Sequence, residues 1–133
     1  MTAHDELSAW TLSHGDATFI HQYVVDAHAA QVADADTKPI ALAMALVGLY
    51  LRVEHQWTGR SIQMAHMRLA RAKREWPAFV LPFGRGAMRE EEVLAAEDRE
   101  AAIDAWAGEV WAAYAESNRA TVDALVREGG ITP

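Results

Sequence analysis

The chain has 133 residues, of which 51% are hydrophobic and 23% are charged. This composition excludes a disordered protein, and the length suits one domain rather than two. The sequence contains no cysteine, which excludes disulfides, thiolate zinc sites and cysteine nucleophiles.

The net charge of −7 is unevenly distributed. Residues 1–51 carry −5, residues 52–89 carry +6 and residues 90–133 carry −8. An antiparallel helical bundle can place such segments side by side, where each exposed ion pair contributes about a few tenths of a kcal/mol. The alternative is an anion-binding or nucleic-acid-binding surface formed by Arg60, Arg68, Arg71, Lys73 and Arg74. The acidic total argues against nucleic acid, because the overall field repels phosphate.

The first ten residues contain Asp5 and Glu6 and have no basic leader followed by an apolar core. We therefore expect a cytoplasmic protein. The most apolar stretch, residues 39–51, ends at Arg52 and is too short to cross a bilayer. No membrane span is expected.

The sequence predicts an all-α fold, a single compact bundle of four main helices spanning residues 1–133. Ser13 and Asp16 have the spacing of a capping box for the first helix, Pro39 suits a first helical position, and Thr58 can cap the third helix. No stretch alternates as a half-buried strand would. The predicted helices are at about 17–32, 39–56, 59–75 and 99–127.

Residues 76–87 contain two prolines and two glycines among apolar side chains. We predict an ordered loop laid over the core between the third and fourth main helices, followed by a short helical turn at about 90–96.

The second helix is apolar over most of its surface and is predicted to be central. Glu54 falls inside its apolar arc, near Val47, Tyr50 and Leu51. A buried carboxylate must be paired, hydrogen-bonded, protonated or bound to a metal. Two interpretations follow: an ion pair with a basic residue of the third helix, or a functional carboxylate.

Histidines supply the other candidate ligands. His21 and His28 lie about 10 Å apart along one helix, so they do not easily share one ion, and no HExxH pattern is present. A site for a divalent metal would combine one of them with Glu54 and with His66. For acid–base catalysis the candidates are Glu54, His21 and His28.

The last helix carries an apolar stripe that turns polar halfway along its length. Either the helix leaves the core for solvent at this point, or it forms one wall of a polar pocket with Glu54 and a histidine. Gln31 lies deep in the apolar arc of the first helix and needs a partner, whereas Asp26 reaches the interior only if that helix is covered on two sides. The candidate pocket residues are Gln31, Tyr50, Ser117, Asn118 and Thr121.

The third helix mixes methionine and arginine on its outward face. Both residue types are enriched in protein interfaces. This face predicts an interface with a protein partner or with a second copy of the chain, formed by Met64, Met67, Arg68 and Arg71.

Residues 19–31 (FIHQYVVDAHAAQ), 45–54, 58–71 and 105–111 resemble an uncharacterised bacterial family of small helical proteins, a domain of unknown function. The resemblance covers most of residues 17–125 and implies a compact helical domain without an established activity. The residues of this chain at the polar positions of the family pattern are His21, Asp26 and Gln31. Relatives with this pattern carry a cysteine pair ahead of the first helix, which this chain lacks, so a metal function of that pair does not carry over.

Two functions therefore stay open. The first is a non-enzymatic interaction module, expected to be a homodimer, that uses the methionine and arginine face or the 76–86 loop. The second is a small metal-dependent or acid–base enzyme with a polar cavity around Glu54 and one or more of His21, His28 and His66.

Overall fold

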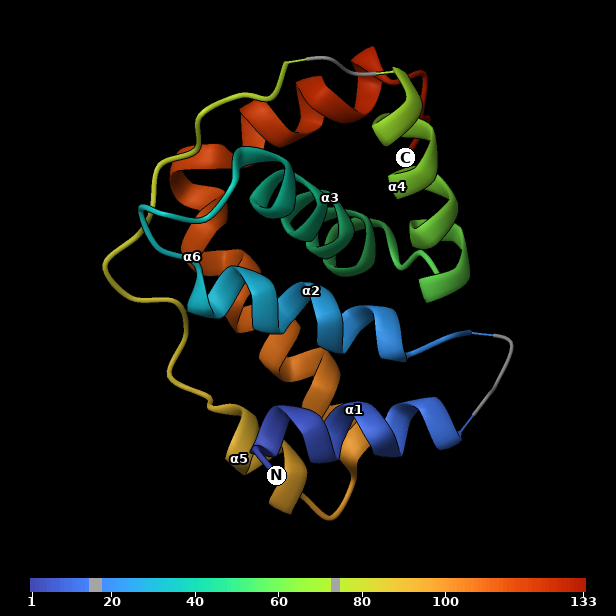
Figure 1. Cartoon of the computed structure of the whole chain (residues 1–133), viewed down its shortest axis with the longest axis vertical. Helices are drawn as coiled ribbons and strands as arrows, with labels where there is room; N and C mark the ends of the chain where they lie inside the picture. The colour runs from blue at the N-terminus through green and yellow to red at the C-terminus, as the bar shows by residue number, and fades with distance from the viewer. Residues whose placement is uncertain (15–17, 73–74) are drawn as a thin grey trace.

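The computed structural model describes residues 1–14, 18–72 and 75–133. These residues form six helices and no strand, so the predicted all-α class is correct. None of the described helices is both long and apolar enough to cross a membrane. The helices are α1 (Ala3–Ser13), α2 (His21–Val32), α3 (Pro39–His55), α4 (Gly59–Ala72), α5 (Glu90–Ala95) and α6 (Arg99–Glu128) (Figure 1).

Helix α3 lies in the middle of the molecule, with α2, α4 and α6 around it (Figure 1). Its apolar sequence explains this position, because a helix that is hydrophobic on nearly all sides is stable only when covered on nearly all sides. Pro39 occupies a first-turn position, as expected. The helix ends at Gln56, which adopts a left-handed conformation with φ 55°. This turn sends the chain into α4 three residues later.

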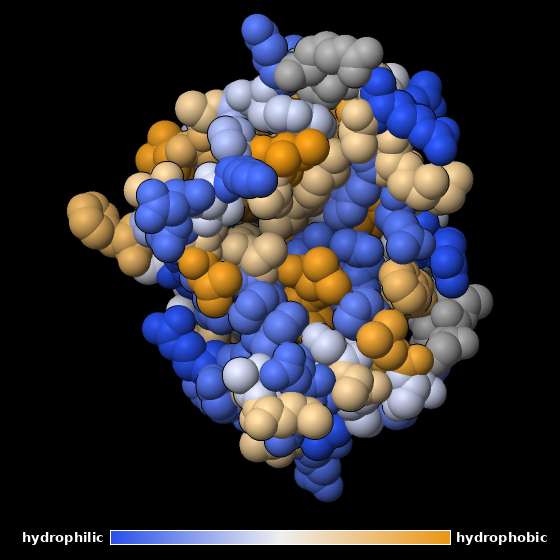
Figure 2. Space-filling model, in the orientation of Figure 1, coloured by the Kyte–Doolittle hydropathy of each residue, from blue (hydrophilic) through white to orange (hydrophobic). Residues whose placement is uncertain are grey.

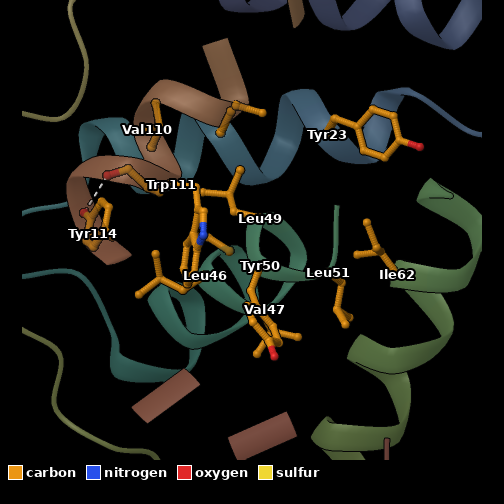
Figure 3. Packing of buried hydrophobic residues seen from close by; sticks show 14 of the residues in the cluster. Tyr23, Leu46, Val47, Leu49, Tyr50, Leu51, Ile62, Val110, Trp111 and Tyr114 are labelled. Atoms are coloured by element: carbon orange, nitrogen blue, oxygen red, sulfur yellow. Dashed lines mark hydrogen bonds between the residues drawn. The ribbon is translucent and has the colours of Figure 1, made fainter. Parts of the chain in front are cut away.

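Helix α6 spans 30 residues and packs along α2 and α3. Its predicted stripe is buried: Ile103, Trp106, Ala107, Val110 and Tyr114. Figure 3 shows Val110 and Tyr114 of this stripe on the side of α3 that carries Leu46 and Leu49. The Tyr114 hydroxyl donates to the backbone oxygen of Ala30 at 2.6 Å. Val122, Leu125 and Val126 are also buried. The helix therefore stays on the core, and the interpretation that it leaves for solvent near residue 117 is wrong.

The N-terminal region differs from the prediction. Residues expected to precede the first helix form α1, which starts with a capping box between Thr2 and Asp5. Helix α2 begins at His21, after Phe19 at φ 55°, rather than at residue 17. The predicted cap residue Asp16 lies outside the described residues. Ser13 ends α1 instead of capping the next helix, because its hydroxyl donates to the backbone oxygen of Trp10.

The other predicted helix ranges overlap observed helices: 39–56 overlaps α3, 59–75 overlaps α4, and 99–127 overlaps α6. The short turn expected at 90–96 is α5. Within residues 75–89, which connect α4 to α5, Phe79 and Leu81 pack on the core while Phe83 is fully exposed. Asn118 holds this segment at Val80, accepting from its N–H and donating to its carbonyl, both at 2.8 Å.

Candidate functional sites

Asp26 is a buried carboxylate on α2 and is 3% exposed. The sequence predicted that Asp26 reaches the interior only if its helix is covered on two sides. This is the case, because α1, α3, α4 and α6 all pack against α2. One oxygen of Asp26 accepts a hydrogen bond from Gln22 at 3.1 Å, and the other has no hydrogen-bond partner. That second oxygen lies 4.0 Å from Nε2 of His66, which is also unpartnered. Burial raises the pKa of Asp26 well above its usual value and lowers the pKa of His66. Both shifts favour the uncharged form of the side chain.

Glu54 is held by α6. Its carboxylate accepts from Nε of Arg119 at 2.8 and 3.0 Å and from the indole N–H of Trp111 at 2.8 Å. Burial raises the pKa of Glu54, but the hydrogen bonds from Arg119 and Trp111 outweigh this and leave it lowered. This geometry fits the ion-pair interpretation. The partner comes from α6 and not from the third predicted helix, because α6 runs along this side of α3.

The candidate ligands predicted from the sequence do not converge. His21 exchanges a hydrogen bond with Thr11 of α1 at 2.9 Å, His66 faces Asp26, and Glu54 faces Arg119. Among the described residues, one group of three potential ligands has its ligand atoms within 4.8 Å of one another. His28 is the member of this group that the sequence predicted as a ligand.

That group is His4, His28 and Glu90. Nδ1 of His4 lies 2.7 Å from Oε2 of Glu90, and Nδ1 of His28 lies 2.7 Å from Oε1. The two imidazole rings stack with centroids 3.6 Å apart and planes 13° from parallel. The Glu90 side chain is 8% exposed, compared with 30% and 31% for the histidines. Three separate helices thus bring two ring nitrogens to one buried carboxylate.

Gln31 fixes the segment that leads into Glu90. It lies three residues after His28 on α2, so the two share a face. Its amide donates to the carbonyl oxygens of Met88 at 2.8 Å and Arg85 at 3.3 Å, and its side-chain oxygen accepts from the indole of Trp106 at 3.1 Å. The partners of this half-buried amide are therefore two loop carbonyls and the indole of the core residue Trp106.

Glu109 of α6 holds the same segment from the other side. Its Oε1 accepts from the backbone N–H of Ala87 at 2.8 Å and of Met88 at 3.0 Å. Residues 85–88 are thus fastened to α2 and to α6 immediately before α5 begins.

The remaining predicted pocket residues are spread over the molecule. The Tyr50 side chain is buried and its hydroxyl donates to Asp123, Ser117 is exposed, and Asn118 binds the loop at Val80. Thr121 lines a different groove from the one that Gln31 lines. The change from apolar to polar along α6 therefore marks the place where Asn118 anchors the loop.

The four predicted interface residues lie together. Met64, Met67, Arg68 and Arg71 line a groove of about 890 Å³ between α4 and residues 130–132, which we call the α4 groove. Met64 is 60% exposed and Met67 is 45% exposed. The floor includes Ala65 and Ile131, and the guanidinium of Arg68 lies over Gly130, where a β-carbon would be 2.8 Å from it. None of the described residues that line this groove is acidic.

Arginines elsewhere pair with acids from neighbouring segments, as in Arg52 with Asp104 at 2.9 Å. None of the ion pairs between described residues includes Arg68 or Arg71. The charge pattern predicted ion pairs between neighbouring antiparallel helices, and the ion pairs between described residues do not include Arg68 or Arg71. On the face seen in Figure 2, hydrophobic residues are distributed in separate patches between hydrophilic ones.

A second groove of about 540 Å³ adjoins the α4 groove. The described residues of its lining include Glu75 and Glu128 beside the apolar side chains of Trp76, Ala124 and Leu125, and none of them is basic; we call it the α6 groove. Ala72 and Gly130 line the α4 groove. Glu75, three residues after Ala72, and Glu128, two residues before Gly130, line the α6 groove. Figure 1 shows the last turns of α4 and α6 at the same end of the molecule.

Comparison with known proteins places this chain in a family. Residues 1–115 match the model of a family described as "Family of unknown function (DUF5946)". The chain belongs to this family. The match confirms the resemblance inferred from the sequence to an uncharacterised family of helical proteins. No curated protein and no solved structure matches the chain.

Sequence reasoning missed two of the three residues in the His4, His28 and Glu90 group. His4 lies in a segment that was not expected to be helical, and Glu90 is the first of three consecutive glutamates. The contacts span 86 and 62 residues along the chain. No local spacing signals contacts of that range, so only the packing of α1 and α5 reveals them.

Proposed function

We propose that this member of the DUF5946 family is a non-enzymatic interaction module that forms a homodimer through the α4 groove. The observation that carries the proposal is the composition of that groove: exposed Met64 and Met67 beside Arg68 and Arg71, with no acidic residue among the described residues of its lining. Methionine adapts its shape to a partner surface, and arginine pairs with carboxylates there.

A second copy of the chain has the complementary surface. The α6 groove is also partly apolar but carries Glu75 and Glu128. Because the two grooves adjoin, a two-fold axis between them lets the α4 groove of each copy face the α6 groove of the other. A two-fold contact of this kind uses the same patch twice and closes the assembly at two subunits.

Charge reversal on each side tests this pairing. The double variant Arg68→Glu with Arg71→Glu makes both grooves acidic, and Glu75→Lys with Glu128→Lys makes both basic. Each double variant is expected to be monomeric, because every groove then faces a groove of its own sign. An equimolar mixture is expected to form dimers again, because one copy's acidic grooves now face the other copy's basic ones.

The matched control is Lys38→Glu, which reverses a charge at an exposed position before α3, away from both grooves. It is expected to leave the dimer intact. Masses are measured by light scattering on the untagged full chain. A monomeric wild type, a dimer that persists in either double variant, or a mixture that stays monomeric would overturn the proposal. A wild type that is monomeric alone but captures an acidic peptide would assign the groove to a different partner.

A further inference from the structure

His4, His28 and Glu90 have the composition of a metal site. Two imidazole nitrogens and one carboxylate form a ligand set found in catalytic zinc sites, where a fourth position stays open to water. We propose that these three residues bind a single divalent transition-metal ion, with zinc the best match, and that this ion joins α1 to α2 and α5. The proposal is independent of the dimer, because none of the three residues lines the α4 or the α6 groove.

The geometry is close to what such an ion requires. Zinc binds imidazole nitrogen and carboxylate oxygen at about 2.0–2.2 Å, which places neighbouring ligand atoms of a tetrahedron about 3.3 Å apart. The two Nδ1 atoms lie 2.7 Å from the Glu90 oxygens. Binding therefore requires these contacts to lengthen by about 0.6 Å. The two imidazole planes, 13° from parallel, also have to tilt apart so that both Nδ1 lone pairs point at the ion. Both histidines are partly exposed, which leaves room for this movement.

The electrostatics favour a cation at this point. Glu90 is a nearly buried carboxylate, and such a charge needs a compensating partner. Two protonated rings stacked 3.6 Å apart would repel each other, whereas two neutral rings can stack and share one ion. A divalent ion supplies the positive charge while both imidazoles stay neutral, which is the form in which histidine binds metals.

The ligands are held in place by the surrounding fold. Gln31 and Glu109 fasten residues 85–88 through four hydrogen bonds, which sets the position of Glu90 two residues later. His28 lies one turn before Gln31 on the same face of α2. Such support is what distinguishes a built site from a chance encounter of surface side chains.

The open side of the site faces a groove of about 430 Å³. All three ligands line it, together with Thr2, Arg89 and Glu91. A water molecule or a small anion has room to take the fourth position. Arg89 and Glu91 place one positive and one negative charge on the wall, so its charge favours neither sign of incoming ligand.

The test measures metal binding by the full untagged chain. Isothermal titration with Zn²⁺ is expected to give one ion per chain. Co²⁺ gives a second readout, because intense visible absorption is the signature of a four-coordinate ion. His28→Ala and Glu90→Gln are each expected to weaken Zn²⁺ binding at least tenfold and to abolish the cobalt spectrum. The matched control is His14→Ala, which removes an exposed histidine at the end of α1 and should change neither signal.

Thermal melting separates a lost ligand from a lost fold. Zn²⁺ is expected to raise the melting temperature of the wild type and of His14→Ala, and to leave that of His28→Ala unchanged. A variant that fails to fold is replaced by His4→Ala, which removes a partly exposed ring from the first turn of α1 together with its contacts to Glu90 and His28. No zinc binding by the wild type would overturn the proposal, and so would binding by His4→Ala and His28→Ala that is as tight as binding by the wild type.

Discussion

The carboxylate of Asp26 occupies the space that a β-carbon on residue 48 would need. A β-carbon built on Gly48 lies 1.8 Å from Oδ2 of Asp26, far inside van der Waals contact. The glycine therefore lets α2 and α3 approach closely enough to enclose a carboxylate between them. Gly48→Ala is expected to lower the free energy of unfolding by about 2 kcal/mol or more, because neither helix backbone can retreat without opening the core. Chemical denaturation measures the change.

Gly108→Ala is the matched control. This glycine also lies inside a helix, α6, but a β-carbon there meets nothing within 4 Å. Alanine should raise the stability by about 0.5–1 kcal/mol, as the helix preferences of the two residues predict. If both variants gain stability, Asp26 does not lie where the structure places it.

Asp26→Asn is expected to stabilise the protein at pH 7. Burial raises the pKa of Asp26 in the folded state above the unfolded value of 3.8. The folded state therefore binds this proton more tightly, and the stability that depends on it is lost as the pH rises from about 3.8 towards the folded pKa. Each unit of difference corresponds to about 1.4 kcal/mol. Asparagine keeps the oxygen that accepts from Gln22 and carries no proton to lose.

Melting temperatures of Asp26→Asn and wild type between pH 4 and pH 8 measure this difference. The gain of the variant should increase with pH and then level off. A variant that is less stable than wild type at pH 7 would show instead that Asp26 is ionised in the fold and pairs with a protonated His66.

The contact between Glu54 and Arg119 should behave as a partly exposed ion pair. A double-mutant cycle with Glu54→Gln and Arg119→Met is expected to give a coupling energy of about 0.5–1 kcal/mol. The pKa of Glu54 is lowered in the fold, so the coupling is present above about pH 4.5 and is lost as the pH falls through the folded value. A cycle measured by denaturation at pH 7 and pH 3 checks both statements. Coupling that is absent at pH 7, or that grows as the pH falls, would contradict them.

Gln31→Ala should loosen the segment that precedes α5. The substitution leaves the indole N–H of Trp106 and the carbonyl of Met88 without their partner, which costs about 1–3 kcal/mol. Urea denaturation measures the loss. The control Gln63→Ala removes an amide that accepts one long hydrogen bond from Arg60, and should cost less than about 0.5 kcal/mol. Equal costs would mean that the Gln31 contacts add nothing to stability.

The helical class and most of the long helices could be predicted from the sequence, because apolar periodicity and the proline at residue 39 are local signals. Helix α1 could not. Its buried residues are Leu7 and Thr11, and one apolar side chain does not make a stripe. It is a helix because Thr2 and Asp5 cap it and because α2 and α5 cover one side, and only the capping pair is visible in the sequence.

The candidate sites also divide into those that local spacing in the sequence predicts and those that depend on packing between helices. Met64, Met67, Arg68 and Arg71 belong to one helix, so their shared face follows from helical spacing. Glu54 was recognised as a carboxylate that needs a partner, but its partner Arg119 is 65 residues away. The group around Glu90 joins α1 and α2 to α5, and Glu90 lies 62 residues beyond His28. Side-chain spacing within a helix is set locally, whereas contacts between helices are set by packing over the whole chain.

The most direct test of the central claim is the mass of the wild-type chain in solution. Sedimentation velocity over a hundredfold range of concentration measures it without a tag. The proposed homodimer has a mass of twice 14.7 kDa and dissociates when Arg68 and Arg71 are changed to glutamate. A wild type that stays at 14.7 kDa at the highest concentration would contradict the proposed homodimer.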